Sequence, residues 1–372
     1  MRHVLLNALF LDPAASGGPE TYLRGLAPAL AAAHPRTRFT VVTTGSGARA
    51  LRADGWEPRF DIRALPCEDG QRARRQLAEQ ALLPALAKGL RADLVHSLAS
   101  VAPIRTPGVA HVITVHDVTF FRRLTFGAVT TFGMRQVVAR AARHADGLVT
   151  ATEVARDEIC EELGLDPAAF TVVPHGAERP APVAAAPEAD VRARYELDGA
   201  RVVLCVASKR PHKNQEVLVR AMPLLGDDVV LVLAGHPEPY DAELRALAQG
   251  LGVTGRIRFA DYVPDDDLEA LWRLAGCAAF PTLAEGFGIP LVEAMARGVG
   301  VAASDIPVLR EVGAGVPRFF DPHAPPAAAE AIRATLADPA AGADGPVRAA
   351  GFTWAAAAEG TWSAYERACT SR

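Results

Sequence analysis

Short apolar runs alternate with amphipathic stretches from one end of the 372-residue chain to the other. Uninterrupted apolar runs are typical of strands buried on both faces of a parallel sheet. In the first half they are His3–Leu9, Phe39–Thr43, Leu94–His96, His111–Val115, Leu148–Ala151 and Thr171–Val173. In the second half they are Val202–Ala207, Val229–Ala234, Ile257–Phe259, Ala278–Phe280 and Val299–Ala303. The stretches between them predict helices, among them Glu20–Ala33, Arg72–Leu90, Met134–Arg143 and Val154–Leu163. This alternation predicts β-α-β units with right-handed crossovers.

A proline-containing segment without periodicity, Gly176–Asp190, interrupts the alternation and is interpreted as an interdomain linker. The chain is also too long for one ordinary core. The pattern therefore predicts two doubly wound, Rossmann-like α/β domains that face each other across a cleft, residues 1–175 and 176–352. In such domains ligands bind beyond the carboxyl ends of the strands, at the topological switch point.

Composition narrows the function classes. A formal net charge of −4 argues against a protein that wraps nucleic acid. The five cysteines are odd in number, far apart and without a Cys-x-x-Cys pair, which argues against a disulfide framework or a zinc site. A reducing, cytoplasmic location is therefore expected. No run reaches ~18 uninterrupted apolar residues, so no membrane span is predicted.

The segment Pro281–Gly298 carries the most chemistry. A predicted strand ends at Phe280, a glycine-bearing loop follows, and Pro290 lies where the first turn of a helix is expected. The amides of Gly286, Phe287, Gly288 and Ile289 at this helix N-terminus form an anion site suited to a diphosphate. Glu293 is placed to accept hydrogen bonds from ribose hydroxyls, and Glu285 from hydroxyls of a sugar.

Residues 285–298, EGFGIPLVEAMARG, resemble the signature of the family 4 retaining glycosyltransferases of the GT-B fold. That signature is a glutamate, seven residues and a second glutamate, usually E-G-F-G-x-P-x-x-E-A-M-A-x-G. The match combines two carboxylates, three glycines and a proline at fixed spacing, and the resemblance covers nearly the whole chain. It implies a hexosyltransferase that uses a nucleotide-diphosphate sugar, retains the anomeric configuration and needs no metal or other cofactor. It also implies that the helix expected within 353–372 packs back on the first domain.

Three further segments fit this resemblance. Gly17 and Gly18 follow the first strand, where the family places a loop close to the donor phosphates. His116 ends the run HVITVHD and resembles the family histidine that contacts the donor sugar. The basic loop Ser208–Asn214 resembles the family loop whose lysine, here Lys213, holds the diphosphate and stabilises the leaving group. Many relatives begin that loop with Gly-Arg; here Ala207 and Ser208 stand instead, which leaves Lys209 or Arg210 as the second cation.

Acceptor binding is assigned to the loops of the first domain. Asp117, Phe120 and Phe121 lie in the segment after His116 and are candidates to line an acceptor pocket. The segment Val173–Gly176 resembles the V-P-N-G turn that ends the first domain of relatives, with His175 in place of the asparagine. Neither the sugar, the base, the acceptor nor the oligomeric state follows from the sequence. The Ala- and Arg-rich composition favours a bacterial source, and either a cell-envelope glycan, a lipid-linked acceptor or a secondary metabolite fits.

Three features of the sequence are typical of other functions. The loop Gly45–Ala50 fits the dinucleotide pattern G-x-G-x-x-A, but it follows the second strand rather than the first. Asp265-Asp266-Asp267 contains the Asp-x-Asp of metal-dependent transferases, and a helix cap with acids in the first turn accounts for it. The basic helix near Arg72–Arg91 is compatible with a peripheral membrane contact, although its apolar positions form an ordinary core-facing stripe.

The sequence thus predicts a metal-independent glycosyltransferase with a nucleotide-sugar donor and a sugar-containing or small-molecule acceptor. One alternative stays within the fold, a pseudo-glycosyltransferase or disaccharide synthase. A second, from another class, is a nucleotide-sugar-binding protein without turnover. A third is an NAD-dependent enzyme that uses the 45–50 loop.

Overall fold

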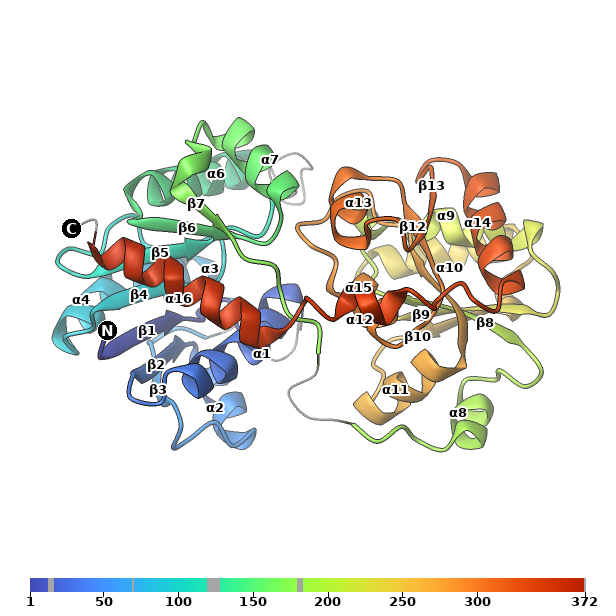
Figure 1. The fold of residues 1–372 in the computed structure, drawn as a ribbon, viewed down its shortest axis with the longest axis horizontal. Coiled ribbons are helices and arrows are strands. Elements are labelled where there is room, and N and C mark those ends of the chain that lie inside the picture. Colours follow the sequence, from blue (N-terminus) through green and yellow to red (C-terminus); the bar gives the residue numbers. More distant parts are fainter. Residues whose placement is uncertain (13–16, 69, 119–127, 179–182, 371–372) are drawn as a thin grey trace. The chain divides into compact units, whose positions relative to one another are not determined.

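A computed structural model describes residues 1–12, 17–68, 70–118, 128–178 and 183–370 of the chain. The described residues divide into two compact units. Unit 1 comprises Met1–Gly176 together with Trp354–Arg372, and unit 2 comprises Ala177–Thr353. The division lies within one residue of the boundaries expected from the sequence. Each unit is built around a parallel sheet covered by helices, so the predicted α/β class is confirmed (Figure 1).

Unit 1 contains a seven-stranded parallel sheet of order β3-β2-β1-β4-β5-β6-β7. Its strands are β1 (His3–Asn7), β2 (Arg38–Thr43), β3 (Asp61–Ala64), β4 (Leu94–Ser97), β5 (Ala110–Thr114), β6 (Gly147–Thr150) and β7 (Phe170–Val172). Its α-helices are α1 (Gly18–Ala33), α2 (Gly45–Ala53), α3 (Arg72–Leu77), α4 (Leu83–Gly89), α6 (Ala128–His144), α7 (Glu153–Leu163) and α16 (Trp354–Thr370), with a 3-10 turn at Pro167–Ala169. The central strands β1, β4 and β5 are buried throughout, as expected for a sheet covered on both faces.

Helix α16 returns from the end of the chain to unit 1. It packs along α1 and against β5, β6 and β7, and Figure 1 shows it crossing this unit as a single long helix. Its residues Trp354, Ala358 and Tyr365 are buried in the same hydrophobic core as Leu23 and Leu26 of α1. The chain end is therefore part of the core of unit 1.

Unit 2 contains a six-stranded parallel sheet of order β10-β9-β8-β11-β12-β13. Its strands are β8 (Arg201–Val206), β9 (Val229–Ala234), β10 (Ile257–Ala260), β11 (Ala275–Phe280), β12 (Val301–Ser304) and β13 (Arg318–Phe320). Its α-helices are α8 (Glu188–Arg194), α9 (Gln215–Ala221), α10 (Tyr240–Gly250), α11 (Asp265–Leu274), α12 (Ile289–Ala296), α13 (Pro307–Gly313), α14 (Pro325–Ala337) and α15 (Gly345–Ala349). Short 3-10 turns occur at Pro211–Lys213, Met222–Leu224 and Thr254–Arg256.

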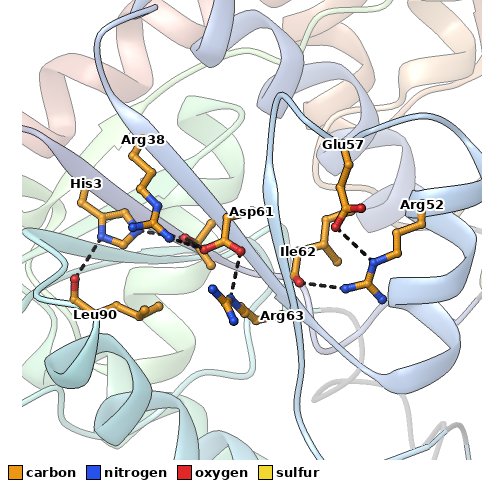
Figure 2. Close-up of polar contacts among 9 residues, drawn as sticks. His3, Arg38, Arg52, Glu57, Asp61, Ile62, Arg63 and Leu90 are labelled. Carbon is orange, nitrogen blue, oxygen red and sulfur yellow. Dashed lines mark hydrogen bonds and ion pairs between the residues drawn. The ribbon is translucent and has the colours of Figure 1, made fainter.

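The structure adds two edge strands that the sequence pattern did not predict, β3 and β13. Figure 2 shows how polar contacts hold β3 in place. Arg38 of β2 and Arg63 of β3 both bind the carboxylate of Asp61, at 2.5 and 2.9 Å. Although burial raises the pKa of Asp61, these two hydrogen bonds hold it below its ordinary value. An edge strand fastened by ion pairs has too few apolar residues to show in the hydrophobic pattern.

The helix expected over Arg72–Leu90 is interrupted. A π-helical turn at Ala78–Leu82 separates α3 from α4. A π-turn inserts one residue into the helix and shifts the side chains that follow it, and such turns are frequent at functional sites. Here it directs Glu79 into the interior, where only 4% of its surface is exposed.

Candidate functional site

The topological switch point of unit 2 lies between β8 and β11. The chain passes from β8 outward to β9 and β10, and from β11 outward in the opposite direction to β12 and β13. Strands β8 and β11 pair in parallel, with Ala278 opposite Leu204. Their carboxyl ends therefore open into two neighbouring loops, residues 207–214 and 281–288, where ligands of doubly wound sheets bind.

Hydrogen bonds join these two loops. The amide of Leu283 donates to the carbonyl of His212 at 2.8 Å, and the hydroxyl of Thr282 donates to the same carbonyl at 3.1 Å. The side-chain amide of Asn214 donates to the carbonyl of Pro281 at 3.1 Å. The two segments that the sequence placed 72 positions apart, at Lys213 and Glu285, are thus held as one surface.

Lys213 and Glu285 form an ion pair at the centre of this surface. Their side chains are 20% and 12% exposed, so both remain within reach of a ligand while being shielded from bulk water. An ammonium group in this position can neutralise diphosphate oxygens, and the carboxylate can accept hydrogen bonds from sugar hydroxyls. The structure therefore brings together two residues that the sequence analysis had proposed separately.

The glycine-bearing loop ends in a left-handed residue. Gly288 has φ +93° and precedes α12, and a Cβ there would lie 3.1 Å from Leu309 and 3.3 Å from Phe280. Glycine is needed because both the backbone conformation and the space disfavour a side chain. The loop backbone is thereby set against the start of α12, where helix amides and dipole favour an anion.

The side chains of this loop have different surroundings. Phe287 is buried, and its ring meets Phe352 edge-on at 5.4 Å, so any contact of Phe287 with a donor would come from its backbone. Gly286 and Gly288 are buried backbone positions, and Ile289 is half-buried at the helix start. Glu293 is half-buried one turn into α12, and its backbone carbonyl accepts a hydrogen bond from Arg297 at 3.0 Å.

The structure separates the two alternatives for a second cation. Lys209 is 0% exposed, and its ammonium donates to the carbonyl of Gly235 at 2.7 Å and to Asp261 at 3.1 Å. A lysine whose charge is bound inside the protein is not available to a phosphate group. Arg210 is nearly half exposed and pairs with Glu238 at 2.6 Å, a surface ion pair that a ligand can displace at little cost. The contacts favour Arg210.

In unit 1 the corresponding switch point lies between β1 and β4. Gly17 is the extended residue that precedes α1, and Gly18 is the first residue of that helix. A Cβ at either position would meet no described atom within 4 Å. Neither glycine is therefore required by packing among the described residues. Residues 13–16, which precede them, lie outside the described part of the chain.

His116 lies two residues beyond β5 and is half-buried. Its Nε2 is 2.9 Å from the carbonyl of Leu98, which fixes Nε2–H as the donor and leaves Nδ1 as an acceptor. Burial lowers its pKa, against the Leu98 carbonyl and Asp117, which both raise it. A neutral imidazole that accepts at Nδ1 suits a contact with a hydroxyl group. Asp117 is half-exposed beside it, whereas Phe120 and Phe121 lie outside the described residues.

An aromatic cluster that the sequence analysis missed supports His116. The ring of Tyr22 meets His116 edge-on at 5.0 Å and lies 4.6 Å from His175. His175 in turn stacks toward Trp354 at 6.3 Å. The histidine that replaces the usual asparagine at position 175 is therefore a packing residue within unit 1. The four residues of this cluster lie in segments far apart in the chain, and no sequence pattern placed them together. The aromatic and imidazole side chains themselves were the only signal in the sequence.

Comparisons with known proteins agree with this geometry. Residues 16–179 match the family model described as Glycosyltransferase Family 4, and residues 188–347 match the model described as Glycosyl transferases group 1. The D-inositol 3-phosphate glycosyltransferase of Kineococcus radiotolerans is 30% identical over 75% of this chain and 67% of its own length. The chain belongs to glycosyltransferase family 4.

Other relatives of this glycosyltransferase are more distant or are covered in part. An O-antigen chain mannosyltransferase B of Escherichia coli is 32% identical over 46% of this chain and 48% of its own length. Among solved structures, a sucrose-phosphate synthase of Thermosynechococcus elongatus has a TM-score of 0.78 at 21% identity, with all of both chains covered. HepE of Anabaena, solved with UDP and glucose, has a TM-score of 0.77 at 18% identity and covers 98% of this chain and 99% of its own. These structures establish the GT-B fold.

Two features with other interpretations take structural roles in the glycosyltransferase. The amide of Ser46 at the start of α2 binds the carboxylate of Glu68 at 3.2 Å, and Thr44 caps the amide of Gly47. The protein itself thus occupies the helix N-terminus that a dinucleotide would use. Of the three acids at the start of α11, Asp267 is fully buried and binds Arg194 and the hydroxyl of Tyr195. These acids lie in the first turn as expected. The residue before the helix is Pro264, which makes no side-chain cap, and the carboxylate of Asp266 accepts a hydrogen bond from the first-turn amide of Asp267 at 3.0 Å.

The remaining expectations concern metals and membranes. The described residues include no cluster of three or more His, Cys, Asp or Glu side chains arranged to hold a metal ion. Among the helices that the structure describes, none combines the length and the apolar composition that a membrane crossing needs.

A buried carboxyl group lies behind the switch point of unit 1 and makes its stability depend on pH. The side-chain amide of Asn7, at the end of β1, donates hydrogen bonds to Glu79 at 2.7 Å and to Ser97 at 3.2 Å. Burial raises the pKa of Glu79 to about 7, against the Asn7 hydrogen bond and the charge of Arg75, which lower it. The network holds the loop that follows β1, because Asn7 also accepts the amide of Leu9 at 3.2 Å.

We therefore expect Glu79→Gln to stabilise unit 1 above neutral pH. Below pH 4.5, the ordinary pKa of an unfolded glutamate, Glu79 is protonated in both states and its raised pKa costs no stability. Between pH 4.5 and about 7 the unfolded state loses this proton more readily than the folded state, so the free energy of unfolding falls. Glutamine keeps the acceptor for Asn7 without the charge. The gain should be small at pH 5 and reach about 1–3 kcal/mol at pH 8. Urea denaturation across this range measures it, and parallel pH profiles for the two proteins would contradict it.

Proposed function

We propose that this chain transfers a hexose-type sugar from a nucleotide-diphosphate sugar to a hydroxyl group of a glycan, lipid-linked or secondary-metabolite acceptor. The observation that carries the proposal is the Lys213–Glu285 pair at the switch point of unit 2, beside the glycine loop and the start of α12. A cation, a carboxylate and the amides at a helix N-terminus are the groups needed for a diphosphate linked to a sugar.

The similarities support this donor and acceptor chemistry. HepE of Anabaena was solved with UDP and glucose, and several curated relatives are D-inositol 3-phosphate glycosyltransferases or mannosyltransferases. The UDP and glucose bound to HepE, and the sugar transfer in the names of the other two relatives, support a nucleotide-sugar donor. The choice among acceptors depends on the loops of unit 1, which differ from one member of a fold to another.

Each residue is assigned a part of the reaction. Lys213 and the amides of Gly286–Ile289 neutralise the diphosphate, with Arg210 as the second cation, so the charge on the leaving group needs no metal ion. Glu293 accepts hydrogen bonds from the ribose hydroxyls, and Glu285 from hydroxyls of the transferred sugar. In unit 1, Gly17 and Gly18 are assigned to the donor phosphates and His116 to the sugar, with Asp117 on the acceptor side.

We further propose that the anomeric configuration is retained. The bond between C1 of the sugar and the phosphate oxygen breaks, the acceptor oxygen bonds to C1 on the same face, and the acceptor proton passes to the leaving phosphate oxygen. No covalent intermediate with the protein is invoked. NMR of the product shows the stereochemistry directly, and an inverted product would contradict this step.

Nucleotide binding tests the assignment. We expect one of UDP, GDP, dTDP or ADP at millimolar concentration to raise the unfolding midpoint, because a ligand at 100 times its Kd adds about 2.7 kcal/mol to stability. Glu293→Ala should lose this rise. Glu330→Ala is the matched control, since Glu330 is an exposed glutamate of unit 2 paired with Arg333 on α14. A rise with NADH alone, or no rise with any nucleotide, would remove the main support for the proposal.

A further inference from the structure

The buried ammonium group of Lys209 joins three loops of unit 2. Lys209 follows β8, and its ammonium donates to the carbonyl of Gly235 after β9 and to the carboxylate of Asp261 after β10. It also lies 3.7 Å from Asp241 at the start of α10. A lysine is rarely fully buried unless its charge is paired, and here the pairing reaches across the carboxyl ends of three adjacent strands.

The backbone of the same loops is closely apposed. Gly235 has φ +144°, and a Cβ there would lie 2.2 Å from the carbonyl oxygen of Ala207. The amide of Lys209 donates to the carbonyl of His236 at 3.3 Å. The loop after β9 therefore packs closely against the loop after β8, and the side chain of Lys209 extends to the loop after β10.

Two aromatic rings project from the loops that Lys209 holds. Tyr262, next to Asp261, is 74% exposed, and its ring lies 6.3 Å from that of His236, next to Gly235. A large exposed aromatic side chain at the ligand-binding edge of a sheet is suited to stacking on a planar ring. Together Tyr262 and His236 form what we call the aromatic wall, one residue away from each of two groups bound by the lysine.

We propose that Lys209 is a positioning residue that holds the aromatic wall for the nucleobase of the donor, and thereby sets affinity for the nucleoside rather than for the diphosphate. This inference rests on the proposed nucleotide-sugar donor. The diphosphate is assigned to Lys213, Arg210 and the 286–289 amides, whereas the Lys209 ammonium contacts Gly235, Asp261 and Asp241. In this proposal nucleoside binding depends on the loops after β9 and β10, which the ammonium group of Lys209 joins to the loop after β8.

The surrounding charges explain why the position needs a cation. Asp241 also binds Arg245 at 2.5 Å, and Arg245 lies over the ring of Phe259 at 4.2 Å from its centroid. Two carboxylates therefore face a single buried ammonium, with Arg245 as a half-exposed second partner. Without Lys209, Asp261 loses its closest cation, since Arg245 lies 3.9 Å away. We therefore expect the Asp261 side chain, and Tyr262 beside it, to be held less firmly.

Binding measurements with nucleotide and with inorganic pyrophosphate separate the two contributions. We expect Lys209→Met to raise the Kd for the preferred member of UDP, GDP, dTDP and ADP at least tenfold, while the Kd for pyrophosphate changes less than about threefold. Arg220→Met, which removes an exposed cation of α9 paired with Glu216, should change neither. Isothermal titration of the full chain gives both constants.

A double-mutant cycle tests whether the lysine acts through the wall. Tyr262→Ala should weaken nucleotide binding by itself, and adding Lys209→Met should weaken it little further, because the wall has already been removed. Asp261→Asn, which alters only a half-exposed partner, should reproduce the nucleotide effect in milder form if Lys209→Met fails to fold.

The outcomes are distinct. Three results would each overturn the inference. The first is unchanged nucleotide binding in Lys209→Met and Asp261→Asn, and the second is an equal loss of pyrophosphate and nucleotide binding. The third is an additive effect of Lys209→Met and Tyr262→Ala on nucleotide binding. Failure of the wild-type protein to bind any of the four nucleotides overturns the proposed function instead, and pyrophosphate binding in that case shows that the phosphate site itself is intact.

Discussion

Lys213→Ala is expected to lower kcat/KM for the donor by about 10²–10³-fold, the range seen when one preorganised group that stabilises a developing anion is removed. Lys213 is the partly exposed cation at the switch point, and its ion pair with Glu285 aims it at the position proposed for the diphosphate. Release of the nucleoside diphosphate from donor sugar, with or without an acceptor, measures the effect before the acceptor is known.

The control for this variant must separate chemistry from stability. Removing Lys213 leaves the carboxylate of Glu285, only 12% exposed, without its cation, so the thermal midpoint is measured in parallel. Arg220→Ala deletes an exposed cation of the neighbouring helix α9 and should leave turnover within about twofold. A fall in activity of less than threefold in a folded Lys213→Ala protein would contradict the role assigned to this lysine.

Trp354→Ala is expected to destabilise unit 1 by about 3–5 kcal/mol, the usual cost of deleting a buried tryptophan side chain. Trp354 begins α16 and is buried against α1 and the segment that ends with Gly176. A Cβ on Gly25 would lie 2.0 Å from its ring, and one on Gly176 would lie 2.4 Å from its backbone nitrogen. Glycines at these two positions make room for the indole, so alanine would leave a cavity that neither can fill.

Trp362→Ala on the same helix is the matched control. Trp362 is half-buried, stacks on His34 at 3.5 Å between ring centroids, and donates its indole N–H to Glu366. Its removal should cost clearly less than that of Trp354. Urea denaturation monitored by circular dichroism compares the free energies of unfolding of the two variants. Equal losses of stability would contradict the larger packing contribution assigned to Trp354. Since Trp354 stacks on His175 and lies near Tyr22, the first variant should also shift the NMR signals of His116.

The sequence predicted the two sheets well because their central strands are buried on both faces. Runs such as Val229–Ala234 have no polar position, and the structure begins and ends β9 at the same residues. The edge strands gave no such signal. β13 has three residues, and β3 has a single fully buried residue among charged ones, so their pairing depends on the neighbouring strand rather than on their own composition.

Long helices show a similar limit. The pattern over Arg72–Leu90 predicted one helix, because apolar residues recur with helical spacing on both sides of the π-turn. The inserted residue is recognised only from tertiary contacts. In the structure Glu79 accepts a hydrogen bond from Asn7 in the interior, and the side chain of Gln80 accepts one from the amide of Ile104. Such a register change is set by tertiary contacts and leaves the local propensity almost unaltered.

By itself the sequence determined the α/β class, the two-domain order and the position of the glycine-bearing loop before α12, because these depend on hydrophobic periodicity and on a motif of fixed spacing. The tertiary structure decided which side chains meet. It paired Lys213 with Glu285, buried Phe287, and placed His175 in an aromatic cluster with Tyr22 and Trp354. It also showed that Lys209, equal to Arg210 as a candidate in the sequence, binds loops that follow two other strands. The reason is physical: contacts between distant segments depend on the order of strands in a sheet and on burial, and neither is written in the local pattern of residues.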